Sequence, residues 1–204
     1  MSMLIIISLV ILLFSIMIHE VAHGSVAYQL GDPTAKYAGR LTLNPLKHID
    51  PFGTILVPLI LVVLTAGNGP IFGWAKPVPV NPFNFRDQKW GSLKVSIAGP
   101  LANFFLAFVF GLLIRLIPLS PTSLYIFSLV VIYNLLLGLF NLIPIPPLDG
   151  SHILFSLLPE KYNNIKTMLS QYGFAILVFF MFLGLPYLFK IAIFFYSLIS
   201  GEPL

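Results

Sequence analysis

The chain has 204 residues, of which 58% are hydrophobic and only 9% are charged. A soluble domain carries about a quarter charged residues, so this composition predicts a membrane protein, with residues 1–204 as a single domain. The net charge of +4 comes without a basic cluster, which argues against a nucleic-acid partner. Cysteine is absent, which excludes disulfides and thiolate metal ligands.

Four stretches are long enough to cross a lipid bilayer, which takes about 20 apolar residues. They are residues 3–30, 93–117, 122–143 and 172–199. Gly184 and Pro186 interrupt the last stretch, so it forms either two shorter helices or one kinked span. A fifth apolar run, residues 52–66, is too short to cross and contains Pro58, which is typical of a re-entrant segment.

Two segments between the spans have the pattern of short extended structure. Residues 39–43 (GRLTL) alternate polar and apolar side chains, and residues 74–80 (WAKPVPV) contain prolines, which allow an edge strand or a polyproline-like run but no central strand. The predicted fold is an all-α polytopic membrane protein, a bundle of about 4–6 transmembrane helices. We expect short β-segments at the membrane boundary and one re-entrant stretch in addition.

The first apolar stretch contains the sequence HEVAH at residues 19–23. Ionisable side chains at membrane depth cost roughly 2.5–3.5 kcal/mol each, so three of them in one helix need a functional reason. His19 and His23 lie one helical turn apart on the same face, the separation at which two imidazoles bind one zinc ion. Glu20 lies beside them, where it can act as general base toward a metal-bound water. A polar helix-packing seam is the alternative, but Ser, Thr or Gly would serve there at lower cost.

Catalytic zinc takes three protein ligands and leaves one position open for water. Asp149 is the favoured third ligand, because it follows a spanning stretch and the prolines at 144, 146 and 147 hold the chain extended there. His152 is the rival ligand, and a plain Asp-Gly turn is the structural alternative for Asp149. The sequence thus predicts one Zn2+ per chain, held by His19, His23 and Asp149.

Three motifs together resemble those of the site-2 protease family of intramembrane zinc metalloproteases. They are HEVAHG at residues 19–24, AGPLANF at residues 98–104 and NLIPIPPLDG at residues 141–150. Residues 31–54 and 73–82 are similar to the small prokaryotic members, so the resemblance covers nearly the whole chain. It implies a member without a PDZ or CBS domain that hydrolyses peptide bonds in or near transmembrane segments of membrane proteins.

The resemblance implies the same three zinc ligands, with Glu20 as the catalytic glutamate. Asn103 and Asn141 match asparagines that help to position substrate in the family. Asn141 is also a candidate hydrogen-bond donor to the substrate backbone or the oxyanion. Helix packing is the alternative role for both asparagines.

A transmembrane substrate must unwind before hydrolysis, because its peptide groups are hydrogen-bonded within its own helix. Lipid offers no partners for the freed groups, so an edge strand of the enzyme would bind them by β-augmentation. We expect this edge at residues 74–80, with Trp74, Val78 and Val80 against the substrate, or at residues 39–43. A purely structural hairpin is the alternative.

Positive charges predict the orientation in the cell membrane, since Lys and Arg are enriched in cytoplasmic loops. If residues 52–66 dip into the membrane and return, nine basic residues lie inside and only Arg115 lies outside, with Lys190 set aside. The nine are Lys36, Arg40, Lys47, Lys76, Arg86, Lys89, Lys94, Lys161 and Lys166. The same path places Asp149 on the side of His19 and His23, so we expect the active site toward the cytoplasm.

Two other function classes are compatible with a polar first helix. A metal transporter needs ionisable groups on several helices, whereas the other spans carry only basic residues near their ends, among them Arg115 and Lys190. A pseudoprotease that binds membrane helices without cutting them would not need the intact HEVAH motif and Asp149. The sequence leaves the substrate and the oligomeric state open.

Overall fold

The computed structural model describes residues 3–64 and 76–203, and these residues form helices with no β-strand among them. The α-helices are α1 (Met3–Gln29), α2 (Thr34–Tyr37), α3 (Val57–Leu64), α4 (Gln88–Leu116), α5 (Pro121–Asn141), α6 (Asp149–Leu157), α7 (Asn163–Leu183) and α8 (Leu185–Ser200). Shorter helical segments in the described part are η1 (Pro45–Lys47), η2 (Pro51–Leu56), η3 (Pro82–Asn84) and η4 (Glu160–Tyr162).

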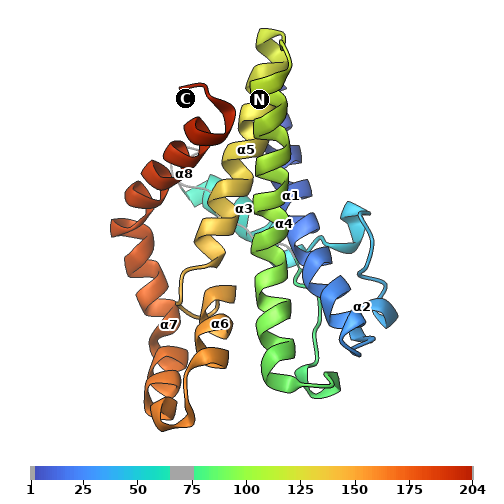
Figure 1. Ribbon diagram of the computed structural model, residues 1–204, viewed down its shortest axis with the longest axis vertical. Helices are drawn as coiled ribbons and strands as arrows, with labels where there is room; N and C mark the ends of the chain where they lie inside the picture. Colours follow the sequence, from blue (N-terminus) through green and yellow to red (C-terminus); the bar gives the residue numbers. More distant parts are fainter. Residues whose placement is uncertain (1–2, 65–75, 204) are drawn as a thin grey trace.

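Within the described residues, 4 helical stretches are long and apolar enough to cross a membrane. They are Ile6–Gln29, Gln88–Leu116, Pro121–Asn141 and Glu160–Leu183. Helix α4 packs against both α1 and α5, and α5 packs against α8; α7 and α8 follow one another along the outer side of α5 (Figure 1). The predicted all-helical, multi-pass arrangement is therefore confirmed.

Capping side chains and prolines set the boundaries of the long helices. Asp87 accepts a hydrogen bond from the Trp90 N–H at 3.1 Å and so begins α4. Ser120 does the same for α5 by accepting the Ser123 N–H at 3.2 Å, and a proline occupies the first helical position. Helix α5 ends just before the proline-rich residues 144–147, which cannot continue it.

The last apolar stretch forms two helices, α7 and α8, which meet at Gly184. Pro186 lies in the first turn of α8, where a missing N–H removes no helical hydrogen bond. Helix α7 begins at Asn163, earlier than the predicted residue 172, because polar residues in its first turns carry no apolar signal. The pair runs from the end of the bundle near α6 to the opposite end (Figure 1), so α7 and α8 together form one column.

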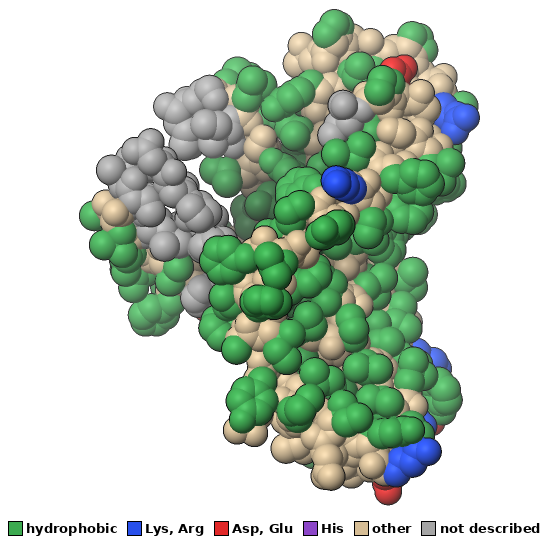
Figure 2. Space-filling view, turned by 90° about the vertical axis from the view of Figure 1, so that its left-hand side faces the viewer, with side chains coloured by type: hydrophobic (Ala, Val, Ile, Leu, Met, Phe, Trp, Pro, Cys, Tyr) green, Lys and Arg blue, Asp and Glu red, His purple; other side chains and the backbone are tan. Residues whose placement is uncertain are grey.

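The bundle core lies where α4, α5 and α8 meet. Ala107, Val131 and Ala192 are completely buried there. On the outer faces, large apolar side chains are exposed, with Phe105 at 66% and Phe182 at 79%, and hydrophobic side chains cover much of the face in Figure 2. An apolar surface of this extent is stable against lipid rather than water, which fits a protein embedded in a bilayer.

The predicted β-segments are not present in the described residues. Residues 39–43 form a turn and a bend, and residues 76–81 run as an elongated loop (Figure 1) without a strand partner. Pro77 and Pro79 have no N–H to donate to a ladder, so the elongated loop does not lead to pairing within the chain. Trp74 of the predicted edge lies outside the described residues.

The fifth apolar run is helical over residues 51–64, where η2 leads into α3. Asp50 begins this helix by accepting the N–H groups of Phe52 at 2.9 Å and Gly53 at 2.7 Å. A helix of this length spans about 21 Å, less than the roughly 30 Å of the hydrocarbon core. Figure 1 shows α3 behind the bundle, near the middle of its height. Residues 65–66, the end of the predicted run, lie outside the described residues.

Candidate active site

Three potential metal ligands from two helices meet inside the bundle. His19 and His23 project from α1, and Asp149 lies in the first turn of α6. The two Nε2 atoms are 3.0 Å apart, and Asp149 Oδ2 lies 3.1 Å from His19 Nε2 and 3.2 Å from His23 Nε2. Both histidines are buried, with 6% and 8% of their surfaces exposed. The three predicted ligands therefore converge on one point.

The loop between α5 and α6 brings Asp149 to this point. Its prolines prevent α5 from continuing, and α6 then begins at Asp149 itself. Gly150 packs so closely that a Cβ there would lie 2.5 Å from the carbonyl oxygen of Ile143. The Asp-Gly pair is thus a tightly packed helix start rather than a plain surface turn, and only glycine permits the close approach.

Both imidazoles are oriented by their Nδ1 atoms. His23 Nδ1 lies 2.6 Å from the carbonyl oxygen of Val95, and a carbonyl only accepts, so Nδ1 carries the proton and Nε2 keeps its lone pair. His19 Nδ1 lies 2.7 Å from Oδ1 of Asn103 and donates in the same way. Both partners are on α4, which can approach α1 because Gly99 has no side chain to collide with the imidazoles.

This donor set suits a divalent metal ion. Two nitrogen lone pairs and a carboxylate oxygen that face one another repel unless a cation lies among them. Zinc binds imidazole nitrogen and carboxylate oxygen readily, so His19, His23 and Asp149 fit it.

Glu20 lies next to the ligands on α1 and is half-buried. Its Oε2 accepts a hydrogen bond from the Val78 N–H at 2.8 Å. Val78 belongs to the elongated loop of residues 76–81, which we call the crossing segment because it passes across α1 at this point. Its peptide group thus holds the Glu20 carboxylate beside the histidines.

A cavity of about 410 Å3 opens onto His19, His23, Asp149 and Glu20. Helix α1 and the first half of α4 form one part of its wall, and the crossing segment and the α5–α6 region form the rest. Its other lining residues are apolar or carry small polar groups: Pro77, Val78, Val80, Pro82, Phe85, Ser92, Val95, Ser96, Asn141, Pro147 and His152. A cavity of this size and lining can hold a short stretch of peptide.

Comparisons with known proteins point to one family. The model for peptidase family M50 matches residues 118–180. YwhC of Bacillus subtilis is 45% identical over 174 residues, which are 81% of this chain and 75% of YwhC. The chain belongs to peptidase family M50.

Other relatives are also named as zinc metalloproteases. Rip2 of Mycolicibacterium smegmatis is 31% identical over 169 residues, 81% of this chain and 62% of Rip2. Zinc metalloprotease MJ0392 of Methanocaldococcus jannaschii is 33% identical over 92 residues, 44% of this chain and 27% of that protein. YwhC and Rip2 are provisionally named zinc metalloproteases. No solved structure matches the chain.

Membership of M50 confirms the resemblance to the site-2 proteases and makes the chain a zinc metallopeptidase of that class. Zn2+ is accordingly its cofactor, and His19, His23 and Asp149 are a group that could hold it. The predicted enzyme class and cofactor are therefore confirmed, whereas the role of each residue remains a prediction.

The remaining predicted site residues differ in their placement. Val80 lines the cavity, as does Asn141, although the Asn141 side-chain amide also donates to the Leu137 carbonyl in its own helix at 3.0 Å. His152 lines the cavity but is exposed and is not part of the converging group. Asn103 is completely buried and contacts His19 instead of the cavity, which does not fit a direct contact with substrate.

Two residues that the sequence did not single out form hydrogen bonds with Asn103 and so continue its contact with His19. Asn134 on α5 and Ser15 on α1 are buried and hydrogen-bonded to it. A signal for Asn134 was available, because an asparagine in the middle of a spanning stretch is costly without partners. Ser15 carries no such signal, since serine is common in membrane helices.

Proposed function

We propose that this M50 peptidase hydrolyses peptide bonds in or near transmembrane segments of membrane proteins, with His19, His23 and Asp149 as zinc ligands and Glu20 as general base. The observation that carries the proposal is the convergence of two Nε2 atoms and a carboxylate oxygen within 3.2 Å. This point lies beside Glu20 in a cavity inside an apolar helix bundle.

The chemistry divides between the metal and the protein. Bound zinc supplies a Lewis acid that polarises a carbonyl and lowers the pKa of water. Glu20 takes the proton from the attacking water and passes it to the leaving amine. The Val78 N–H holds the Glu20 carboxylate at the cavity wall, and the second N–H of Asn141 is available to the substrate carbonyl.

The crossing segment supports a role in substrate binding. It is an elongated loop, and Pro77, Val78 and Val80 line the cavity. An unwound substrate needs hydrogen-bond partners that lipid does not offer. We propose that the substrate lies along the crossing segment as an added strand and donates hydrogen bonds to its backbone carbonyls, because the N–H groups of Lys76, Val78 and Asn81 already have partners.

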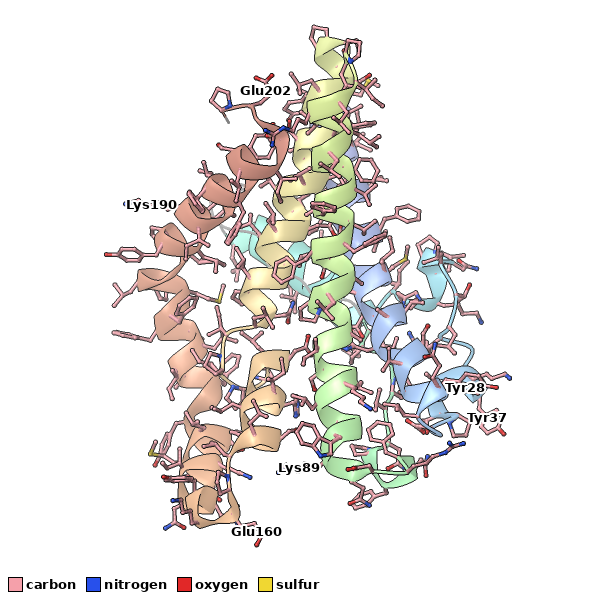
Figure 3. All side chains as sticks on the ribbon, viewed as in Figure 1. Tyr28, Tyr37, Lys89, Glu160, Lys190 and Glu202 are labelled. Carbon is pink, nitrogen blue, oxygen red and sulfur yellow. The ribbon has the colours of Figure 1, made fainter. Side chains whose placement is uncertain are left out.

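The membrane orientation we propose has the active site toward the cytoplasm of the cell. The N- and C-termini lie toward one end of the bundle (Figure 1), while Lys89 and Glu160 lie at the other end (Figure 3). The helical residues 51–64 are too short to cross, which supports a re-entrant path. Nine basic residues then lie inside and Arg115 outside, in agreement with the positive-inside tendency.

The experiment that tests the proposal measures zinc content and cleavage of a membrane-spanning reporter by the purified protein in detergent micelles. Glu20→Gln should retain stoichiometric zinc and lose cleavage, because it removes the base and no ligand. Phe83→Ala serves as the matched control, since Phe83 is 81% exposed and does not line the cavity; it should cleave normally. Equal cleavage by Glu20→Gln and the unmodified protein would overturn the assignment.

A further inference from the structure

Three polar residues beyond His19 form a buried group that does not line the cavity in the described structure. Asn103 on α4 and Asn134 on α5 are completely buried, and Ser15 on α1 is 3% exposed. A polar group buried among apolar side chains costs free energy unless it is hydrogen-bonded. The partners of these three residues therefore indicate what the group is for.

The orientation of the Asn134 side chain follows from an unambiguous partner. Its amide nitrogen lies 2.9 Å from the carbonyl oxygen of Val130 and 2.9 Å from Ser15 Oγ. A backbone carbonyl has no proton to donate, so the atom facing Val130 must be the NH2 group. The oxygen of Asn134 is consequently turned toward Asn103.

The orientation of Asn103 follows in the same way. Its amide nitrogen lies 2.8 Å from the Asn134 oxygen and 3.2 Å from the backbone carbonyl of Ser15. Both of those atoms accept, so Asn103 presents its own oxygen to His19 Nδ1, 2.7 Å away. That oxygen can only accept, so Nδ1 of His19 must carry the imidazole proton.

We propose that Asn134 and Ser15 are positioning residues that select the metal-binding tautomer of His19 through Asn103. If the Asn103 amide flipped, its NH2 group would face Nδ1, the proton would move to Nε2, and His19 could no longer bind a metal through that nitrogen. The two backbone carbonyls and the Asn134 amide prevent the flip. His23 needs no such chain, because the Val95 carbonyl orients it directly. The inference rests on the proposed role of His19 as a ligand.

The test uses imidazole 15N spectra of the metal-free protein in micelles and zinc affinity by competition with a chelator. The signals of the 4 histidines are assigned with His→Gln variants. Asn134→Leu should add a population of His19 with the proton on Nε2 and should weaken zinc binding by about 10-fold, the lower end of outer-shell effects. Ser15→Ala, a milder change, should shift the tautomer in the same direction by a smaller amount.

Tyr196→Phe provides the matched control. It removes another hydrogen bond of α5, between Ser128 Oγ and the Tyr196 hydroxyl at 2.7 Å, which has no connection to His19. It should lower thermal stability as Asn134→Leu does, while leaving the tautomer and zinc affinity unchanged. If Asn134→Leu and Ser15→Ala both leave the His19 spectrum and zinc affinity unchanged, the inference is overturned. A failure of the Glu20 experiment alone would overturn the proposed catalysis and leave the tautomer result intact.

Discussion

At the scale of single residues, the two histidines are supported in different ways. His23 is oriented by the Val95 carbonyl, which no side-chain substitution removes, whereas His19 depends on the side chain of Asn103. Both orientations require α4 to lie close to α1. Gly99 makes this possible, since a Cβ there would lie 2.6 Å from His19 Cε1 and would also collide with His23 Nε2.

Gly99→Ala should therefore displace the ligands and weaken zinc binding by about 10- to 100-fold. Gly138→Ala is the control, because its Cβ would meet the Phe104 ring at 2.6 Å, a comparable collision between α4 and α5. Both variants should melt at lower temperature, and only Gly99→Ala should lose zinc in a chelator titration. A normal zinc affinity for Gly99→Ala would mean that the ligands do not need this close approach.

The third ligand can be tested directly. Asp149→Ala should lose most of the bound zinc, because two histidines leave the coordination incomplete. His152→Ala should keep it, since His152 is exposed and lies outside the converging group. Elemental analysis of the purified variants checks both. Zinc lost from His152→Ala and kept by Asp149→Ala would reverse the assignment.

At the scale of elements, the crossing segment is held by three N–H groups. Lys76 donates to the His48 carbonyl at 2.9 Å, Val78 to Glu20 at 2.8 Å and Asn81 to the Asp32 carboxylate at 2.7 Å. The prolines between them have no N–H to offer. Asp32, immediately after α1, thereby ties the end of the segment to the helix that carries the ligands.

Asp32→Asn should destabilise this attachment. The Asp32 carboxylate also accepts from Asn84 Nδ2 at 2.8 Å and from Thr34. Asparagine has an NH2 group in place of one accepting oxygen, so one of the N–H or O–H donors around this side chain loses its partner. An unpaired donor costs about 1–3 kcal/mol of stability. Thermal unfolding in micelles measures the loss. Asp87→Asn is the control, because asparagine caps a helix as well as aspartate and should be near neutral.

The same carboxylate adds a pH dependence. Burial raises the pKa of Asp32, but hydrogen bonds from Thr34, Asn81 and Asn84 outweigh it and hold the pKa below the ordinary value of 3.8. A lowered folded-state pKa means that the stabilisation is present above pH 3.8 and is lost as the pH falls through the folded value. The stability difference between the unmodified protein and Asp32→Asn should therefore shrink in acid. A difference that stays constant down to pH 2 would contradict the ionised state of Asp32.

The proposed contact between the crossing segment and substrate leads to a crosslinking experiment. A photoreactive residue at Val80, which lines the cavity, should capture a membrane-spanning substrate in the Glu20→Gln protein. The same group at Phe83, which is exposed and does not line the cavity, should give few adducts. Equal yields at the two positions would argue against strand-like binding.

At the scale of the whole molecule, the fold brings distant parts of the chain to one end of the bundle. α1 and α5 run in the same direction, away from the end of the bundle where the termini lie (Figure 1), and the part of α1 that carries His19 and His23 meets Asp149 at the start of α6. For two helices to run in the same direction, the chain between them must cross the membrane once in the opposite direction. Helix α4 makes that crossing, so the helical residues 51–64 do not cross. The proposed zinc site and the proposed membrane topology therefore depend on each other.

Cysteine labelling tests this topology, because the natural chain contains no cysteine. Lys89→Cys and Glu160→Cys should react with a membrane-impermeant thiol reagent only from the cytoplasmic face. Thr122→Cys and Glu202→Cys should react from outside intact cells, and all four positions are exposed. If Lys89→Cys and Glu160→Cys reacted on opposite faces, the chain between them would cross the membrane a different number of times. Asp149 would then lie on the other side of the membrane from His19 and His23.

The sequence alone determined the spanning stretches and the histidine pair, for local physical reasons. A bilayer requires about 20 apolar residues in a row, and helical geometry places residues i and i+4 on one face whatever surrounds them. The prolines at 144, 146 and 147 similarly marked the end of the preceding spanning stretch and placed Asp149 just beyond it. These features depend on neighbours in the chain, so they could be predicted from it.

Only the tertiary structure decided how these parts are held. His19 and Asn103 are separated by 84 positions, and Glu20 and Val78 by 58. Such contacts depend on the depth and rotation at which α1, α4 and the crossing segment pack, which no local pattern specifies. For the same reason the sequence left Asn103 between a substrate contact and helix packing, and it led us to expect an edge strand at residues 74–80 or 39–43. In the folded chain, packing against α1 buries Asn103 behind His19 and directs the Val78 N–H to Glu20. Buried polar groups need hydrogen-bond partners, and these are the nearest ones.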